Sequence, residues 1–569
     1  MDSGGKLKVV TVPTKPFEGQ RPGTSGLRKP VATYMQPNYT ENFIQCIMDA
    51  GLGEKKKGAK IVVGGDGRYL SDQVLEKIFK IAAANGVGHI LIGKKGLMTT
   101  PSVSLAIREF KADGAIILTA SHNPGGPKGD FGIKFNGSNG GPAVESVTEK
   151  IYQMSTRISE YHLCPDLKIA YDAVGRQEVK VDNVGTMVVE VFDSVSQYAD
   201  RMEQMFDFRL LKSLLSGQLT GKAFRVLIDS LHGVTGPYVV AIYHERLGAP
   251  IENFRHYNTL PDFGGCHPDP NLTYAAGLVA EMQKGLHDFG AAFDGDGDRN
   301  MIIGEKGFFV TPSDSLAILA CHADSFPYFK NTGGVKGYAR SMPTAAAVDR
   351  VAKKFNRECF EVPTGWKFFG NLMDAGRLSI CGEESFGTGC DYIREKDGIW
   401  SSLAWLTVLA NCQMSVGDIV RKHWSTFGRN VFTRYDYENC DGAACKAMME
   451  QLEKTILDAS FVGKTFTKSG RAFTVAKADN FSYTDPIDHS VSKNQGLRVC
   501  FTDNSRLVYR LSGTGSTGAT VRVYVDSYEE KVERQTLPSS ELLKPLIEVA
   551  LDLCEIKKYT GRDKPTVIT

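Results

Sequence analysis

The chain has 569 residues, 42% of them hydrophobic and 23% charged, and a globular chain of this length is expected to form about three to five domains. Its 67 Lys and Arg nearly balance its 65 Asp and Glu, for a net charge of +2, which argues against nucleic acid or another polyanion as its main partner. The first ten residues lack the apolar core of a signal peptide, and no apolar run approaches a membrane span of about 18 residues, so we expect a cytoplasmic protein. Its twelve cysteines form no CxxC pair, and we expect them to be reduced thiols.

Alternating strand and helix patterns begin near residue 59, where short apolar runs rich in β-branched residues are followed by segments of helical period. Strands are expected at 115–118, before "TASHNPGGPKGD", and at 224–228, before a polar turn and a helix. Further on, "DFGAAFDGDGDRNMIIG" places an acidic loop between two strands, "VKGYARSMPTAAAVDRVAKKF" runs from strand to helix, and "LSICGEESFG" ends a strand in an acidic loop. This repetition predicts three related α/β units, each with functional residues just past a strand end.

The C-terminal part has a different pattern. It combines the helical stretch "CKAMMEQLEKTILDA" with the strand-rich "GLRVCFTDNSRLVYRLSGTGSTGATVRVYVDSY", which predicts an antiparallel sheet with helices on one face, an α+β domain. We therefore expect four domains, at 1–195, 196–310, 311–425 and 426–569.

The acidic loop "DGDGDR" is a candidate metal site, because its glycines let Asp294, Asp296 and Asp298 converge on a divalent cation. An EF-hand is the obvious alternative, since these residues fit its first, third and fifth positions and Glu305 fits its twelfth. Two features oppose it: Arg299 stands where the sixth position needs glycine, and the flanks "GAAF" and "MIIG" resemble strands rather than helices. Mg²⁺ suits the loop, since it binds a few carboxylates together with a phosphate oxygen.

The glycine-rich loop "RLSGTGSTGATVR" matches the dinucleotide pattern GxGxxG in form, but a strand is expected after it where that motif requires a helix. Its hydroxyls, from Ser512 and Thr514, and its guanidinium groups, from Arg510 and Arg522, predict a loop that surrounds a phosphate. A flexible hairpin with solvated arginines is the alternative. A second loop of this composition, "PGTSGLRKP", contributes Arg28.

The loop "GEESFG" ends an apolar run with Glu383, Glu384 and Ser385. Adjacent carboxylates often form only a solvated turn. A sugar, however, needs acceptors for its hydroxyl groups, and carboxylates beside a hydroxyl side chain supply them. Thr364 and Gly365 in "PTGWKFFG" and Lys396 in "REKDG" are further candidates for the same pocket.

The loop "TASHNPGGPKGD" presents Ser121 as a turn residue or a nucleophile. No GxSxG motif and no His/Asp relay accompany it, so a hydrolase triad is not supported. A hydroxyl on a rigid loop, three carboxylates for a divalent ion and a phosphate-binding loop are instead the parts that phosphoryl transfer needs. Because no Walker A motif or kinase signature is present, a nucleotide donor is not expected.

Four motifs, "TASHNPGGPKGDFGIKFN", "FDGDGDRN", "CGEESFG" and "RLSGTGS", occur in this order along the chain. In this the sequence resembles the α-D-phosphohexomutase superfamily over essentially its whole length. The "GEES" form is similar to that of the eukaryotic-type, glucose-selective phosphoglucomutases. The resemblance implies a four-domain fold around a central cleft, with one α/β topology shared by the first three domains.

The resemblance also implies an activity: a monomeric intramolecular phosphotransferase of the isomerase class that acts on small sugar phosphates. It would interconvert glucose 1-phosphate and glucose 6-phosphate through a phosphoserine and glucose 1,6-bisphosphate, with one Mg²⁺ per chain. A non-catalytic relative that acts as a binding or scaffold protein in secretion or the cytoskeleton is the alternative. Such a protein should show damage in the serine loop, whereas "SHNPGG" and the three aspartates are intact.

Residue roles follow from the same resemblance. Ser121 would carry the phosphoryl group and complete the Mg²⁺ site of Asp294, Asp296 and Asp298. The other implied roles are Arg299 beside that phosphate; His122 and Lys134 in proton handling; Glu383 and Ser385 on sugar hydroxyls; Thr364, Gly365 and Lys396 along the pocket; and Arg510, Ser512, Thr514, Arg522 and Arg28 on the other phosphate. A lone His beside a strand end is often only structural, so the role of His122 stays open.

Overall fold

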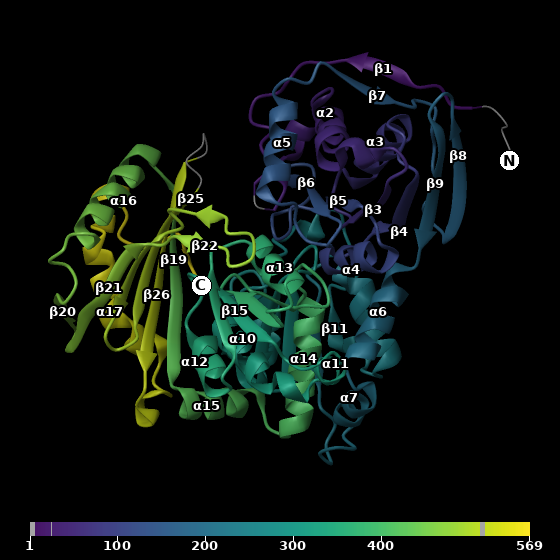
Figure 1. Cartoon of the computed structure of the whole chain (residues 1–569). Coiled ribbons are helices and arrows are strands. Elements are labelled where there is room, and N and C mark those ends of the chain that lie inside the picture. Colours follow the sequence, from purple (N-terminus) through teal and green to yellow (C-terminus); the bar gives the residue numbers. More distant parts are fainter. Residues whose placement is uncertain (1–5, 24, 513–517) are drawn as a thin grey trace.

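The computed structural model describes residues 6–23, 25–512 and 518–569 (Figure 1). Three mixed sheets come first in the chain. The first has the order β2 (Leu27–Pro30), β6 (Asp130–Gly137), β5 (Gly114–Leu118), β3 (Lys60–Gly65), β4 (His89–Leu97), β9 (Gly185–Phe192), β8 (Gly175–Val181). The second has β11 (Phe254–Arg255), β10 (Val226–Asp229), β12 (Phe289–Phe293), β13 (Asn300–Gly304), β14 (Phe308–Val310), and the third β16 (Glu358–Val362), β15 (Gly337–Ser341), β17 (Ile380–Glu383), β18 (Gly387–Cys390).

The three sheets contain the same four-strand unit. Its spatial order is β4-β3-β5-β6 in the first sheet, β11-β10-β12-β13 in the second and β16-β15-β17-β18 in the third. In each unit three strands are parallel and the last pairs antiparallel with its neighbour. This confirms the prediction of three related α/β units. In chain order, the first strand of each unit lies between the second and the third, so the direction in which strands are added to the sheet reverses between the first and third strands. Sheets of this kind bind their ligands at that position.

The parallel strands are apolar because helices cover both of their faces. In β3, Ile61 and Val63 pack into the cluster that includes helix α3 (Ser71–Ala84), whereas Val62 faces the cluster of α4 (Thr100–Phe110). The strand β5, with the sequence GAIIL, is buried along its whole length. Buried strands of this kind hold their carboxyl ends rigidly, and the loops that follow them are the predicted functional loops.

The second and third sheets share one core around helix α14 (Gly398–Cys412). Thirteen of its fifteen residues are buried, which explains its apolar sequence. Among the described residues no single helix is long and apolar enough to cross a membrane; α14 and α15 (Val416–Phe427), which meet at 81°, reach that length and composition only as a pair.

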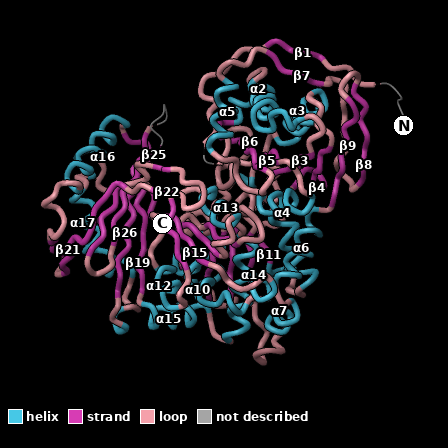
Figure 2. Tube along the Cα trace, in the orientation of Figure 1, coloured by secondary structure: helices cyan, strands magenta, loops and turns pink. Residues whose placement is uncertain are grey.

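The last sheet is antiparallel and lies at the left of Figures 1 and 2. Its strand order is β20 (Thr465–Lys468), β21 (Arg471–Asn480), β24 (Leu497–Phe501), β25 (Arg506–Ser512), β26 (Ala519–Glu529), β19 (Arg429–Cys440), β27 (Val567–Ile568). Helices α16 (Gly442–Ile456) and α17 (Ser539–Leu553) share a core with one face, and on the other face Val508 and Tyr524 pack against Trp366 of the third unit. The α+β prediction is confirmed. The boundaries near 195, 310 and 425 stay predictions.

A buried histidine predicts how the stability of the fold responds to acid. His423 in α15 is only 7% exposed, and burial lowers its pKa to about 3. Below the ordinary pKa of about 6.5, the unfolded chain binds a proton on His423 and the folded chain does not. The contribution of His423 to the free energy of unfolding is therefore fully present above that pH and decreases as the pH falls toward 3. At pH 5 we expect a loss of about 2 kcal/mol from this residue.

Chemical denaturation at pH 7.5 and pH 5 measures this effect. We expect His423→Gln to be destabilised at pH 7.5 by loss of packing and to show a smaller drop between the two pH values than the unsubstituted protein. An equal drop in both proteins would contradict the prediction.

Candidate active site

Three loops, one from each α/β unit, meet at the carboxyl ends of the third strands. Ser121 follows β5, Asp294 follows β12 and Glu384 follows β17. The second and third loops are joined where Arg299 and Gly387 form an isolated β-bridge. The first and second are joined by the hydroxyl of Ser121, which donates to Asp294 Oδ2 at 2.8 Å. Residues 173 positions apart thus form one site, as the predicted phosphoryl-transfer chemistry requires.

Ser121 is 1% exposed and has a positive φ of 54°, a conformation that a residue with a side chain rarely adopts. Its backbone N–H donates to Thr119 Oγ1 at 2.8 Å. The Oγ atom lies 2.8 Å from Asp294 and 3.4 Å from Nδ1 of His122. The hydroxyl therefore points at the carboxylates and has a neutral base candidate beside it.

Asp294, Asp296 and Asp298 form the only group of three or more acidic, His or Cys ligands found within the described parts of the chain, with one oxygen of each inside 4.8 Å of the others. All three are buried, and burial together with the two neighbouring carboxylates raises the pKa of Asp294 well above its ordinary range. Among the described residues, Oδ1 of Asp296 and Oδ1 of Asp298 have no hydrogen-bond partner. Strands flank this loop, so the EF-hand alternative is wrong, and buried, unpaired carboxylate oxygens fit a small divalent cation.

Cationic side chains surround the serine and the carboxylates. Nε of Arg28 and Nε of Arg299 are buried without a hydrogen-bond partner in the described structure, and Nζ of Lys396 lies 3.5 Å from Asp298. Burial, with the positive charges of Arg299 and Arg28, lowers the pKa of His122 well below its ordinary value. An anion carried by Ser121 would meet unused guanidinium donors here. Lys396 therefore lies between the two loops, because its aliphatic chain also packs against Gly387, the last residue of "GEESFG".

Lys134 occupies a buried ion pair with Glu395, which also accepts a hydrogen bond from Asn136 at 2.9 Å. The pair joins β6 of the first unit to the loop before α14 in the third. Glu395 has no counterpart among the sequence predictions, although it stands beside Lys396 in the quoted "REKDG". The contacts of Lys134 in the structure are with this carboxylate and not with Ser121, so its part in proton handling stays a prediction.

The sugar-loop candidates come together at the end of β17. Glu383 Oε1 accepts the backbone N–H of Gly365 at 3.0 Å, and the neighbouring Thr364 accepts from Arg510 Nη1 at 2.8 Å through its hydroxyl. Ser385 is half-buried in the same loop. The predicted sugar-binding residue Glu383, the predicted pocket residues Thr364 and Gly365, and the predicted phosphate-binding residue Arg510 of the last sheet are therefore adjacent.

The last sheet contributes neighbouring arginines. Arg510 of β25 and Arg522 of β26 are directly opposite each other, and Ser512 ends β25. Nε of Arg522 lies 3.7 Å from Asp436. Thr514 falls in 513–517, outside the described residues.

Arg434 was missed by sequence analysis. It contacts Glu384 at 3.2 Å and Asp436 at 2.9 Å, and although burial opposes its charge, those two carboxylates raise its pKa. Thr100, which donates to Asp296 Oδ2 at 2.7 Å, was also missed. Both lie in regular elements, where no local pattern marks them.

Comparison with known proteins places this arrangement in a family. Models described as phosphoglucomutase/phosphomannomutase α/β/α domains I, II and III match residues 19–162, 197–307 and 312–427, and a phosphoglucomutase-1 C-terminal domain matches 429–566. The chain belongs to the phosphoglucomutase/phosphomannomutase family.

Similar proteins match from end to end. Phosphoglucomutase 1 of Drosophila melanogaster is 56% identical over 564 residues, and human phosphoglucomutase-1 is 55% identical over 565, each alignment covering 99% of this chain and all of the relative. The open form of pp63/parafusin, an exocytosis-sensitive phosphoprotein and phosphoglucomutase of Paramecium, superposes with a TM-score of 0.90 at 45% identity, over 99% of this chain and all of that one. The four-domain phosphoglucomutase/phosphomannomutase architecture inferred from the sequence is confirmed.

Proposed function

We propose that the protein is a phosphoglucomutase that interconverts glucose 1-phosphate and glucose 6-phosphate, with Ser121 as the phosphoryl carrier. The observation that carries the proposal is the 2.8 Å contact between the Ser121 hydroxyl and Asp294, inside a cluster of three carboxylates and next to unpaired arginine donors. The intact serine loop and carboxylates disfavour a purely non-catalytic scaffold. Monomeric state and cytoplasmic location remain expectations.

Asp294, Asp296 and Asp298 would hold Mg²⁺, together with an oxygen of the Ser121 phosphate. When bound, this ion supplies positive charge that stabilises the transferring phosphoryl group. Arg299 would bind oxygens of the Ser121 phosphate. The resemblance implies Arg28 at the other phosphate, but its charge interacts with Asp296, Asp298 and Arg299, so we assign it to the same phosphate as Arg299. Glu383 and Ser385 would orient sugar hydroxyls.

In the first half-reaction the phosphoryl group moves from Ser121 Oγ to the free 6-hydroxyl of glucose 1-phosphate. The bond between phosphorus and Ser121 Oγ breaks, a bond between phosphorus and the sugar 6-oxygen forms, and the proton lost by the sugar hydroxyl ends on Ser121 Oγ. Nδ1 of His122 lies 3.4 Å from Ser121 Oγ, and burial with the charges of Arg299 and Arg28 lowers the pKa of this histidine; we therefore assign it the exchange of a proton with that oxygen. Glucose 1,6-bisphosphate then turns over, and Ser121 takes the phosphoryl group from position 1 to leave glucose 6-phosphate.

Arg510 and Arg522 would bind the phosphate that is not being transferred, together with Ser512 and Thr514. In each half-reaction the distal phosphate occupies this place. Arg522→Ala should lower kcat/KM by roughly ten- to a hundredfold, because a charge-assisted hydrogen bond contributes about 1.5–3 kcal/mol. The variant should also depend more on added glucose 1,6-bisphosphate, since each escaped intermediate leaves Ser121 unphosphorylated.

Steady-state kinetics with and without added bisphosphate test this, with binding of free glucose as the control. If Arg522→Ala weakens glucose and glucose 1-phosphate binding equally, or gains no dependence on the bisphosphate, the distal phosphate lies elsewhere. The proposed activity itself is tested by following formation of glucose 6-phosphate from glucose 1-phosphate in the presence of Mg²⁺.

A further inference from the structure

A buried ion pair that no motif singled out stands beside the serine loop. Asp66 and Arg68 follow β3, the strand that pairs with β5, so they lie at the point where the strand order reverses. Their side chains contact at 2.9 Å, and both are 0% exposed. A pair buried so completely has no role as a surface charge, and its hydrogen bonds indicate what it does.

The guanidinium of Arg68 binds the serine loop through backbone carbonyls. Nη2 donates to the carbonyl of Ser121 at 2.8 Å, and Nη1 donates to the carbonyls of Asp130 at 3.0 Å and Asn123 at 3.4 Å. Nε and Nη2 also bind Asp66. Four of the five N–H donors of the guanidinium are therefore hydrogen-bonded, to one carboxylate and to both ends of one loop, and Nη2 also forms an ion pair with Asp66.

The same network holds the N–H of Ser121. That N–H donates to Thr119 Oγ1 at 2.8 Å, and the Thr119 hydroxyl donates in turn to Asp66 Oδ2 at 2.6 Å. Arg68 thus binds the backbone carbonyl of Ser121 directly, and Asp66 holds its backbone N–H through the hydroxyl of Thr119.

Such support is needed because Ser121 has a φ of 54°, which is unfavourable for a residue with a Cβ atom. A loop freed from Arg68 can relax to an ordinary conformation and turn Oγ away from Asp294. Phosphoryl transfer depends on alignment of the attacking and leaving oxygens, so a small rotation is costly. Since Asp66 neutralises Arg68, the pair acts through geometry rather than net charge.

We propose that Arg68, held by Asp66, is a positioning residue that fixes the backbone of Ser121 in the orientation required for phosphoryl transfer. The proposal rests on the proposed function, because it takes Ser121 as the phosphoryl carrier. A lysine keeps the charge but cannot donate to a carboxylate and three carbonyls in the planar geometry of a guanidinium.

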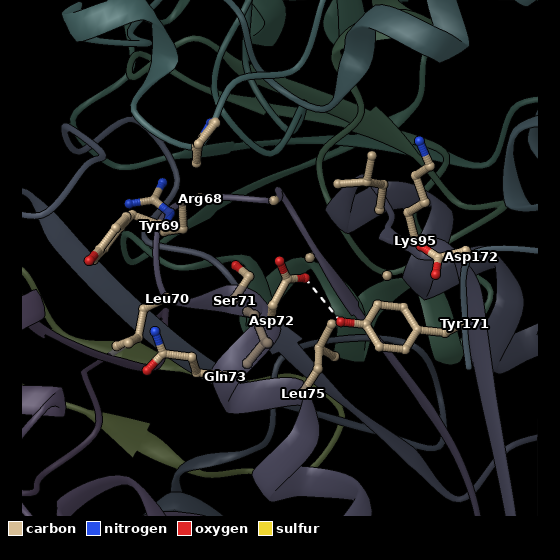
Figure 3. A pocket seen from close by; sticks show the side chains of 16 residues that line it. Arg68, Tyr69, Leu70, Ser71, Asp72, Gln73, Leu75, Lys95, Tyr171 and Asp172 are labelled. Atoms are coloured by element: carbon tan, nitrogen blue, oxygen red, sulfur yellow. Dashed lines mark hydrogen bonds between the residues drawn. The ribbon is translucent and has the colours of Figure 1, made fainter. Parts of the chain in front are cut away.

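Arg68 also lines a cavity of about 620 Å³ between the end of β3, the start of α3 and the segment around Tyr171 (Figure 3). Lys95 and Asp172 line the same cavity, opposite Arg68 in the view. The Arg68 side chain itself is 0% exposed, so its removal in Arg68→Ala would leave a void next to this cavity, and a small planar cation added in solution then tests for the missing guanidinium.

The principal experiment compares Arg68→Lys with the matched variant Arg471→Lys. Arg471 similarly binds a carboxylate, of Asp503, and a backbone carbonyl, of Tyr528, but lies within the last sheet. For Arg68→Lys we expect kcat to fall by roughly ten- to a hundredfold with KM unchanged. Phosphorylation of Ser121 by glucose 1,6-bisphosphate, followed by intact mass, should slow by the same factor. Arg471→Lys should retain both rates.

Chemical rescue distinguishes positioning from a general loss of stability. Guanidinium chloride at a non-denaturing concentration should raise kcat of folded Arg68→Ala, whereas urea, planar but uncharged, should not. Normal kcat and normal Ser121 phosphorylation in Arg68→Lys would overturn the proposal. Folded Arg68→Ala whose kcat does not respond to guanidinium would overturn it as well. If Arg68→Ala does not fold, the result for Arg68→Lys decides. Failure of the unsubstituted protein to become phosphorylated on Ser121 would instead refute the proposed function.

Discussion

Ser121→Ala is expected to abolish mutase turnover and to leave the fold intact. The substitution removes only the hydroxyl, which is the group proposed to carry the phosphoryl group and which contacts Asp294 at 2.8 Å. The packing loss is small because Ala keeps the Cβ atom of a loop residue. Activity should fall below detection in a coupled assay that runs from glucose 1-phosphate to glucose 6-phosphate, while the circular dichroism spectrum stays unchanged.

Ser71→Ala is the matched control for this experiment. Ser71, in the same α/β unit, is also buried, but its hydroxyl has no hydrogen-bond partner within the described structure. Removal of that hydroxyl should change neither activity nor the melting temperature. Undiminished activity in Ser121→Ala would refute the phosphoserine mechanism, whereas loss of activity in both variants would point to damage of the unit as a whole.

Asp296→Asn is expected to give the second large loss. Asp296 is 2% exposed, its Oδ2 accepts from Thr100, and its Oδ1 is left for a ligand. Loss of a residue that merely orients a metal ligand typically costs 10–100-fold in affinity or activity, so loss of a proposed ligand should lower kcat by roughly a hundredfold or more.

The Mg²⁺ dependence of stability provides an independent reading of the same substitution. Mg²⁺ should raise the melting temperature of the unsubstituted protein, because it binds the folded state and offsets repulsion among three buried carboxylates. In Asp296→Asn that shift should shrink, and the protein without Mg²⁺ should be no less stable than the parent, because one buried negative charge is gone. Normal kcat at saturating Mg²⁺ together with an unchanged thermal shift would contradict the assignment of the carboxylate loop.

The sequence predicted those parts of the site that depend on local patterns. Ser121, Asp294 and Glu383 each lie at or just past the end of an apolar strand, and glycine or proline nearby marks a loop. That these loops form one site was expected from their combined chemistry and from the resemblance to a family. The three α/β units were visible from a local pattern too, since a buried parallel strand followed by a helix leaves a strong hydrophobic period.

The parts that the sequence did not predict depend on distant pairings. Glu395 matters because it meets Lys134, 261 positions away, and Arg434 because it meets Glu384 across two sheets. Arg68 lies in "GGDGR", which has no spacing typical of a nucleophile, a metal site or a phosphate loop. Its contribution follows from the carbonyls that surround it, and carbonyl positions depend on the folded backbone.

The most direct test of the account is the site of covalent phosphorylation. The purified protein is incubated with glucose 1,6-bisphosphate and Mg²⁺, its intact mass is measured, and the modified peptide is sequenced by mass spectrometry. We predict the addition of one phosphoryl group, located on Ser121, and its removal when the phosphorylated protein is mixed with excess glucose 1-phosphate. A protein that catalyses the interconversion while it carries no phosphoryl group on Ser121, or carries one that glucose 1-phosphate cannot remove, would contradict the account.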